Sequence, residues 1–243
     1  MGKYVRLVVG CLAAVASSLI ASTAFAAPQM QKVLAGDGSG AVVFIHGKAD
    51  CSGAMSDCNG GDSTNGPGAY WTNDANNATL LTEATLRYDS SGIAHHYAAY
   101  VIGHDLDSQG FWYSANDVAG CLTDLINGNN GNGCNPNGYH ATSFFVVTHS
   151  AGATVIDRIV SSGWWPGITS AIKSIGALAP ALAGSRASSA LYGVDGYSGW
   201  CSTLVSWLAG WAIKNNGAWS LTRGQVIGQA NNVFVFPGIG LGA

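Results

Sequence analysis

Residues 143–152 read Ser-Phe-Phe-Val-Val-Thr-His-Ser-Ala-Gly, an apolar run that passes directly into a helical pattern over 151–160. The run predicts a buried strand, and the pattern after it predicts a helix. A strand that turns sharply into a helix holds the residue at the turn at positive φ. We therefore expect the side chain of Ser150 to stand above the carboxyl edge of a sheet. Ala151 and Gly152 are small enough to relieve crowding between the strand and the helix.

Strands and helices alternate on both sides of this stretch. The apolar, β-branched run Ala41-Val42-Val43-Phe44-Ile45 predicts a strand buried on both faces. Further strands are expected at 97–102, 143–147, 173–178 and 232–236, and helices at 76–87, 114–126, 151–160 and 200–213. Ser114 and Asp117 would begin the second of these helices as an acidic variant of a capping box. The alternation predicts an α/β fold with a mostly parallel sheet flanked by helices.

A second group of interest follows the strand at 41–45. His46-Gly47-Lys48 ends that strand, and Gly47 allows the backbone to turn close to a bound substrate. The backbone N–H of Lys48 could then face the same point as the N–H of Ala151. Two such amides can stabilise an oxygen that becomes negatively charged during a reaction.

Composition limits the class of protein. The chain has 243 residues, of which 48% are hydrophobic and 9% are charged, with 10 Lys and Arg against 13 Asp and Glu. This length suits one domain. Few charges and many apolar residues exclude a disordered chain. The absence of any basic run argues against binding to nucleic acid.

The first 26 residues have the three parts of a secretory signal peptide. Lys3 and Arg6 form a basic start, residues 7–20 are apolar, and Ala24-Phe25-Ala26 is a cleavage site. We therefore expect a mature domain over 27–243, outside the cell or in the periplasm. A membrane anchor is the alternative, but the apolar stretch is short for a span. No other segment of the sequence predicts a transmembrane helix.

Export permits disulfide bonds. Cys51 with Cys58, and Cys121 with Cys134, are plausible local pairs that close loops rich in Gly and Asn. Cys201 is then left without a partner in the mature chain.

The His-Gly dipeptide after a buried strand, the elbow Thr148-His149-Ser150-Ala151-Gly152 and the strand–helix order between them resemble the α/β-hydrolase family, particularly its secreted lipases, esterases and polyester depolymerases. The resemblance covers about residues 41–236. It implies an α/β-hydrolase fold, with Ser150 as the nucleophile and the amides of Lys48 and Ala151 as the oxyanion hole. An ordinary helix N-cap is the alternative role for Ser150.

The sequence departs from the family pattern at three points. Thr148 stands where the family usually has glycine, and a β-branched residue crowds the elbow. No histidine follows Ser150, although the family places its general base on a loop after the last strand. The chain also ends soon after the expected strand at 232–236, where the family supplies one more strand and a closing helix. We expect a sequence incomplete at its C-terminus; an inactive homologue and an unusual base are the alternatives.

The catalytic acid is less well marked than the nucleophile. Asp157 and Asp195 are the only carboxylates after Ser150. Asp157 belongs to the helix at 151–160 and is expected to pair with Arg158 or with solvent. Asp195 follows the fourth strand in a loop and is the better candidate; its alternative role is that of a turn residue beside Gly196.

The resemblance implies a secreted serine hydrolase that acts on carboxylic esters of small molecules, lipids or polyesters. Its activity in this chain is expected to be poor, since serine needs an adjacent base. An acyltransferase and an inactive binding protein on the same scaffold are the alternatives. No cofactor is expected, and His95, His96, His104, Asp105 and Asp107 match no zinc pattern. Trp200, Trp207 and Trp211 repeat at helical spacing and could contact a lipid interface or cover the core.

Overall fold

The computed structural model describes residues 27–37, 40–48, 68–72, 75–106, 110–182 and 184. Several predicted features lie outside these residues. They are the signal peptide, the pair Cys51–Cys58, Asp195, Cys201, the helix at 200–213 and the strand at 232–236.

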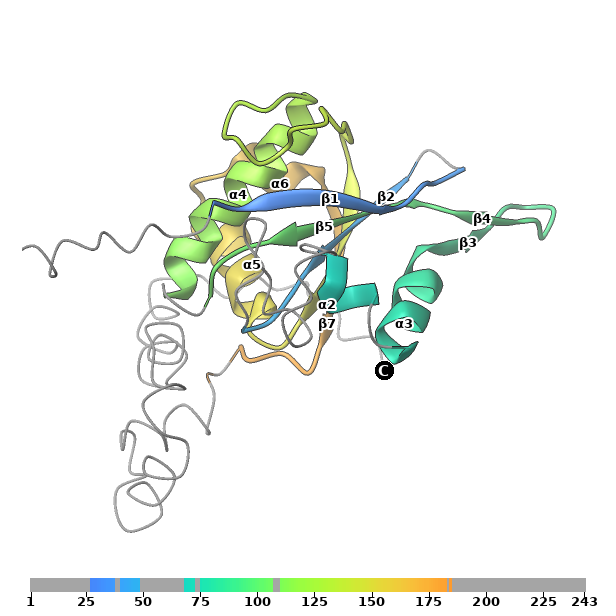
Figure 1. Cartoon of the computed structure of the whole chain (residues 1–243), viewed down its shortest axis with the longest axis horizontal. Helices are drawn as coiled ribbons and strands as arrows, with labels where there is room; N and C mark the ends of the chain where they lie inside the picture. The colour runs from blue at the N-terminus through green and yellow to red at the C-terminus, as the bar shows by residue number, and fades with distance from the viewer. Residues whose placement is uncertain are drawn as a thin grey trace, which may run out of the picture.

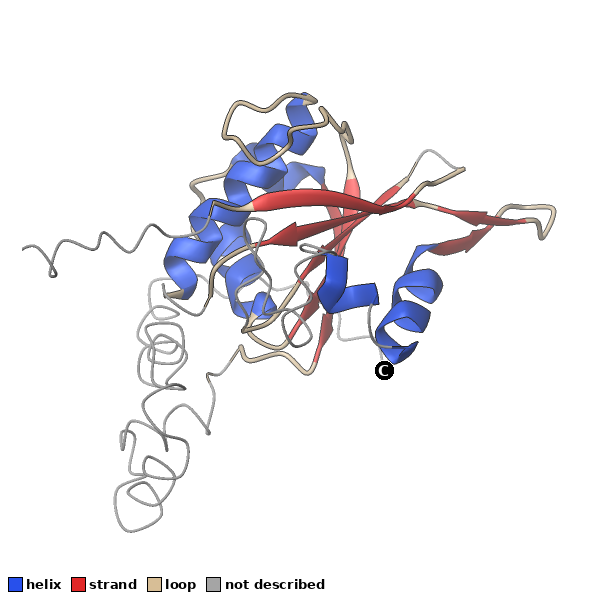
Figure 2. Ribbon diagram, viewed as in Figure 1, coloured by secondary structure: helices blue, strands red, loops and turns tan. Residues whose placement is uncertain are grey.

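The described chain forms a mixed sheet with helices on both faces (Figure 1). The main sheet has the order β1-β5-β2-β6-β7, and its strands are β1 (Gln29–Leu34), β2 (Ala41–Ile45), β5 (Ala98–Gly103), β6 (Phe144–His149) and β7 (Ile172–Leu178). Among the described strands of this main sheet, only β1 runs antiparallel to its neighbour. The helices are α2 (Ala69–Thr72), α3 (Ala75–Thr85), α4 (Phe111–Asn127), α5 (Gly152–Ser161) and α6 (Pro166–Ala171). A two-stranded sheet of β3 (Leu86–Tyr88) and β4 (Ala94–His96) extends from one end of the molecule (Figure 2).

Strand β2 lies between two hydrophobic layers, one on each face of the sheet. All five of its residues are buried, as the sequence predicts. Val43 and Ile45 join a core that also includes residues of α4, α5 and α6. Val42 and Phe44 point to the opposite face, where they meet Trp71 of α2 and residues of α3. The strand is therefore apolar throughout because both of its faces are covered.

The predicted elements within the described residues are confirmed, with small shifts at their ends. The strands expected at 97–102, 143–147 and 173–178 are β5, β6 and β7. The helix expected at 151–160 is α5. The mostly parallel sheet is confirmed as well, since β2–β5, β2–β6 and β6–β7 are all parallel pairs.

Two expectations about helix ends are wrong. The helix expected over 76–87 stops at Thr85, because Leu86 and Arg87 pair with β4 as part of β3. The capping box of Ser114 and Asp117 is also wrong, since α4 begins three residues earlier, at Phe111, after Gly110. The buried Ser114 hydroxyl instead donates to the carbonyl oxygen of Asp105 at 2.8 Å.

One predicted disulfide is present. Cys121 in α4 is bonded to Cys134, and their Cα atoms lie 5.1 Å apart. The carboxylate of buried Asp124 accepts hydrogen bonds from the backbone N–H groups of Asn132 and Cys134. The Cys134 carbonyl accepts from the N–H of Met30 in β1 at 2.9 Å. The disulfide loop thus connects the end of α4 to the first strand.

Candidate active site

Ser150 lies at the turn between β6 and α5 with a φ of 51°. In the described residues only one other non-glycine residue has positive φ, Ala179 at 43°, directly after β7. Such a conformation is costly for an L-residue and persists when its surroundings enforce it. Both strained residues lie at the carboxyl ends of neighbouring parallel strands, which is the expected place for a site in an α/β protein.

Hydrogen bonds from the next crossover hold the turn. The Ser150 N–H donates to the Leu178 carbonyl at 2.9 Å, and the Ala181 N–H donates to the Ser150 carbonyl at 3.1 Å. The Thr154 hydroxyl donates to the Ala181 carbonyl, also at 3.1 Å. Backbone groups of residues 178–181 thus fix the main chain of residue 150. The Ser150 hydroxyl makes no hydrogen bond to any residue that the structure describes.

Two glycines let the segments meet at this point. A Cβ atom on Gly152 would lie 2.5 Å from the carbonyl oxygens of both Ile45 and His46, so no side chain fits there. A Cβ atom on Gly47 would lie 2.9 Å from Ser150 Cβ and 3.1 Å from the His149 carbonyl oxygen. The backbone after β2 therefore lies against the turn that carries Ser150. The sequence predicts a small residue at 152 to relieve crowding between β6 and α5, but it does not predict this contact with the segment after β2.

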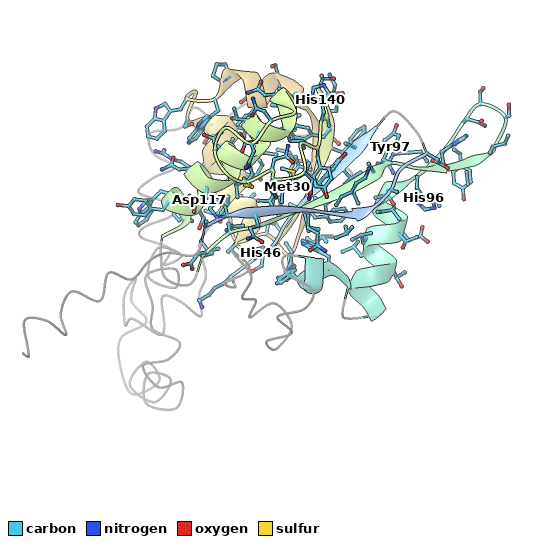
Figure 3. All side chains as sticks on the ribbon, turned by 45° about the horizontal axis from the view of Figure 1, so that its top comes forward. Met30, His46, His96, Tyr97, Asp117 and His140 are labelled. Carbon is cyan, nitrogen blue, oxygen red and sulfur yellow. A yellow bond between two sulfur atoms is a disulfide. The ribbon has the colours of Figure 1, made fainter. Side chains whose placement is uncertain are left out.

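Two buried histidines support the segment after β2. The rings of His46 and His104 are stacked, with centroids 4.0 Å apart, and both side chains are fully buried. His46 Nδ1 lies 2.7 Å from the Gly47 carbonyl oxygen, to which it can only donate, and His46 Nε2 accepts from the His104 backbone N–H at 3.2 Å. Burial and the neighbouring His46 hold the pKa of His104 well below its usual 6.5. Figure 3 shows His46 at the end of the sheet away from His96.

Tyr70 and His149 form a second pair beside Ser150. The Tyr70 hydroxyl lies within hydrogen-bond distance of His149 Nδ1. Burial lowers the pKa of His149 and raises that of Tyr70. Tyr70 belongs to the four-residue helix α2, in a stretch where the sequence analysis expects neither a helix nor a strand. Sequence reasoning missed it because so short a helix carries no apolar periodicity.

The structure describes some of the predicted site residues but not all of them. Ser150, the amide of Ala151 and the segment Gly47-Lys48 come together at the carboxyl ends of β2 and β6. Asp195 lies outside the described residues. Asp157 is partly buried in α5, which raises the pKa of its carboxyl. Its expected partner Arg158 lies over the ring of Trp164, 4.5 Å from the centroid.

The other histidines that the sequence analysis considered as metal ligands lie in different environments. His95 lies between the carboxylates of Asp37 and Asp89, at 3.7 and 3.3 Å. His96 Nδ1 is 3.1 Å from the Thr85 hydroxyl, and Figure 3 shows His96 well away from His46, on which His104 is stacked. Among the described residues, no three His, Cys, Asp or Glu side chains gather as a metal site would require. In the same residues, no helix has both the length and the apolar character needed to cross a membrane.

Comparison with known proteins supports the fold. No protein-family model and no curated protein sequence matches the chain. Among solved structures, the mature form of Bacillus licheniformis lipase BlEst2 is similar at a TM-score of 0.53 and 15% identity, over 86% of this chain and 66% of that one. The propeptide form of the same lipase gives 0.52 and 17%, over 85% of this chain and 35% of that one. The chain thus spans just under two thirds of the mature lipase and shares with it an α/β fold.

Proposed function

We propose that this chain is a secreted serine hydrolase of carboxylic esters, with Ser150 as its nucleophile. The observation that carries the proposal is the strained φ of 51° at Ser150, at a strand-to-helix turn against which the backbone of Gly47 is packed. An ordinary helix N-cap has extended backbone and accepts hydrogen bonds from the first turn. The likeness in fold to a lipase supports the same assignment.

In the proposed reaction the Ser150 oxygen attacks the carbonyl carbon of the ester. Its proton passes to a general base, and the carbonyl oxygen becomes an oxyanion that accepts hydrogen bonds from the amides of Lys48 and Ala151. The intermediate then collapses: the carbon–oxygen bond to the alcohol breaks, and the alcohol leaves with the proton. Water hydrolyses the acyl-enzyme in the second half of the reaction.

The general base and the acid limit the proposed activity. Asp195 stays our candidate for the acid. No histidine follows Ser150 in the sequence, and His46 and His149 are already engaged with Gly47 and Tyr70. We therefore expect slow turnover by the 243 residues. The apolar residues around the turn favour an uncharged acyl group, as in lipids or polyesters, over a charged one.

A fluorophosphonate probe tests the nucleophile without requiring turnover. We expect a slow adduct whose mass maps to Ser150, with no adduct on the Ser150→Ala variant. Ser170→Ala is the matched control, because that serine lies exposed in α6 and should leave labelling unchanged. Hydrolysis of a short p-nitrophenyl ester by the same three proteins measures the turnover.

Two results would contradict the proposal in different ways. An unlabelled Ser150 in the native chain would remove the nucleophile and favour an inactive binding protein. Fast turnover that Ser150→Ala abolishes would keep the nucleophile and overturn the expectation of a missing base.

A further inference from the structure

Tyr70 lies where the segment after β2 meets the turn that carries Ser150. Its neighbour Trp71 anchors α2, since that side chain is fully buried and its ring centroid lies 5.1 Å from that of Phe44 in β2. The Tyr70 ring packs between two histidines, with centroid distances of 5.3 Å to His46 and 5.7 Å to His149. This packing sets the position of the Tyr70 hydroxyl.

That hydroxyl joins two segments far apart in the sequence. Its oxygen lies close to the Gly47 backbone, because a Cβ atom on Gly47 would be 3.2 Å from it, so the Gly47 N–H is within reach to donate to it. It also contacts His149 Nδ1, the side chain directly before Ser150. A phenolic hydroxyl can accept one hydrogen bond while it donates another. The Tyr70 hydroxyl can therefore accept from Gly47 and donate to His149 at the same time.

Gly47 is consequently held on both of its backbone groups. The Tyr70 oxygen holds its N–H, and His46 Nδ1 donates to its carbonyl oxygen at 2.7 Å. The Gly47 carbonyl and the Lys48 N–H belong to one planar peptide and point in opposite directions. Fixing the first therefore fixes the second. Glycine would otherwise be free to rotate, because it lacks a Cβ atom.

We propose that Tyr70 is a positioning residue, whose hydroxyl holds the His46–Gly47 peptide against the nucleophile turn through the Gly47 N–H and His149, and so restricts rotation of the Gly47–Lys48 peptide that follows. This role rests on the proposed ester hydrolysis. Loss of the hydroxyl would leave the Tyr70 ring in place but release the Gly47 N–H. The His46 ring alone would then hold the Gly47–Lys48 peptide, so the Lys48 amide would be aligned for less of the time, and stabilisation of the oxyanion would fall while ground-state binding stayed the same.

Tyr70→Phe tests the role because it removes one oxygen and keeps the ring. We expect fluorophosphonate labelling of Ser150, and kcat for a short ester, to fall about tenfold with KM unchanged, as for one weakened oxyanion donor. Tyr97→Phe is the matched control: this ring stacks on Phe145 and its hydroxyl makes no hydrogen bond within the described residues. Labelling of Tyr70→Phe at the native rate would overturn the role.

A second measurement separates this role from the proposed function. NMR of the ¹⁵N-labelled chain should show His149 Nδ1 as a hydrogen-bond acceptor and a well-ordered Gly47 amide, and Tyr70→Phe should shift both signals. Unchanged signals would overturn the inference even if Ser150 reacts. Shifted signals in a chain whose Ser150 does not react would keep the Tyr70 contact and refute the hydrolase.

Discussion

Thr148 lies in β6, two residues before Ser150. Its side chain is fully buried, and its hydroxyl has no hydrogen-bond partner in the described part of the chain. A buried hydroxyl without a partner costs about 1–3 kcal/mol. Strand β6 therefore carries a local energetic cost two residues before Ser150.

Replacing that hydroxyl by a methyl group should stabilise the protein. We expect Thr148→Val to raise the free energy of unfolding by about 1 kcal/mol, because the two side chains have similar shape. Thr154→Val is the control, since the Thr154 hydroxyl donates to Ala181 and its loss should lower the free energy of unfolding by about 1 kcal/mol. Urea denaturation measures both; a loss of stability in Thr148→Val would show that the hydroxyl is satisfied.

At this scale the sequence predicts Ser150 and Gly47 but not Tyr70. The first two belong to a local pattern, in which a strand, a turn and small residues follow one another. The importance of Tyr70 comes from contacts with Gly47 and His149, and the latter is 79 residues away. No local pattern encodes such a contact.

At the scale of elements, the approach of α5 to the end of β2 determines the geometry of the site. The start of the helix lies against the carbonyl groups of Ile45 and His46, with Gly152 as the residue between them. Any side chain at position 152 would push the helix away from the strand and move the Ala151 amide with it.

Gly152→Ala should therefore be costly. Its methyl group would meet main-chain oxygens at 2.5 Å, and overpacking of this kind typically costs about 1–3 kcal/mol of stability. Gly167→Ala in α6 is the control, because a Cβ atom there has open space and alanine favours helix by up to about 1 kcal/mol. Thermal unfolding compares the two; equal melting temperatures would show that α5 can shift without strain.

The sequence predicts central elements better than peripheral ones. Strand β2 is apolar on both faces and is predicted to the residue. The edge strand β1 pairs antiparallel with β5, and its residues Gln-Met-Gln-Lys-Val-Leu do not alternate regularly between polar and apolar, so the sequence did not predict it. The β3–β4 hairpin is short and mostly exposed, so burial leaves no strong pattern in its sequence.

At the scale of the whole molecule, pairing across the sheet brings the site together from distant parts of the chain. The ends of β2, β5, β6 and β7 supply His46, His104, Ser150 and Leu178 respectively. Parallel register places these ends at one edge, which explains why strand order alone predicts where the site lies. Asp195, the proposed acid, lies outside the described residues.

The stacked histidines make the stability of the folded chain depend on pH. The pKa of His104 is well below 6.5 in the folded protein, so below that pH the unfolded chain binds a proton that the folded chain does not. Stability is therefore full above pH 6.5 and falls as the pH drops. The raised pKa of the Asp157 carboxyl has the opposite effect: its contribution to stability increases as the pH falls.

We expect the free energy of unfolding to fall by about 1–1.5 kcal/mol between pH 7.5 and 5.5 from His104 alone. His104→Gln should be less stable at both pH values but should lose less between them. Urea denaturation of both proteins at each pH measures the difference. Equal losses in the two proteins would show that His104 does not cause the dependence.

The amides of Lys48 and Ala151 have one consequence for mutagenesis. Every amino acid except proline supplies the same N–H, so alanine scanning would leave the Lys48 amide intact and would make no change at all at Ala151. Only changes that bend or remove the peptide itself, such as Lys48→Pro, would reveal them. In such a scan the proposed reaction would be attributed to Ser150 alone.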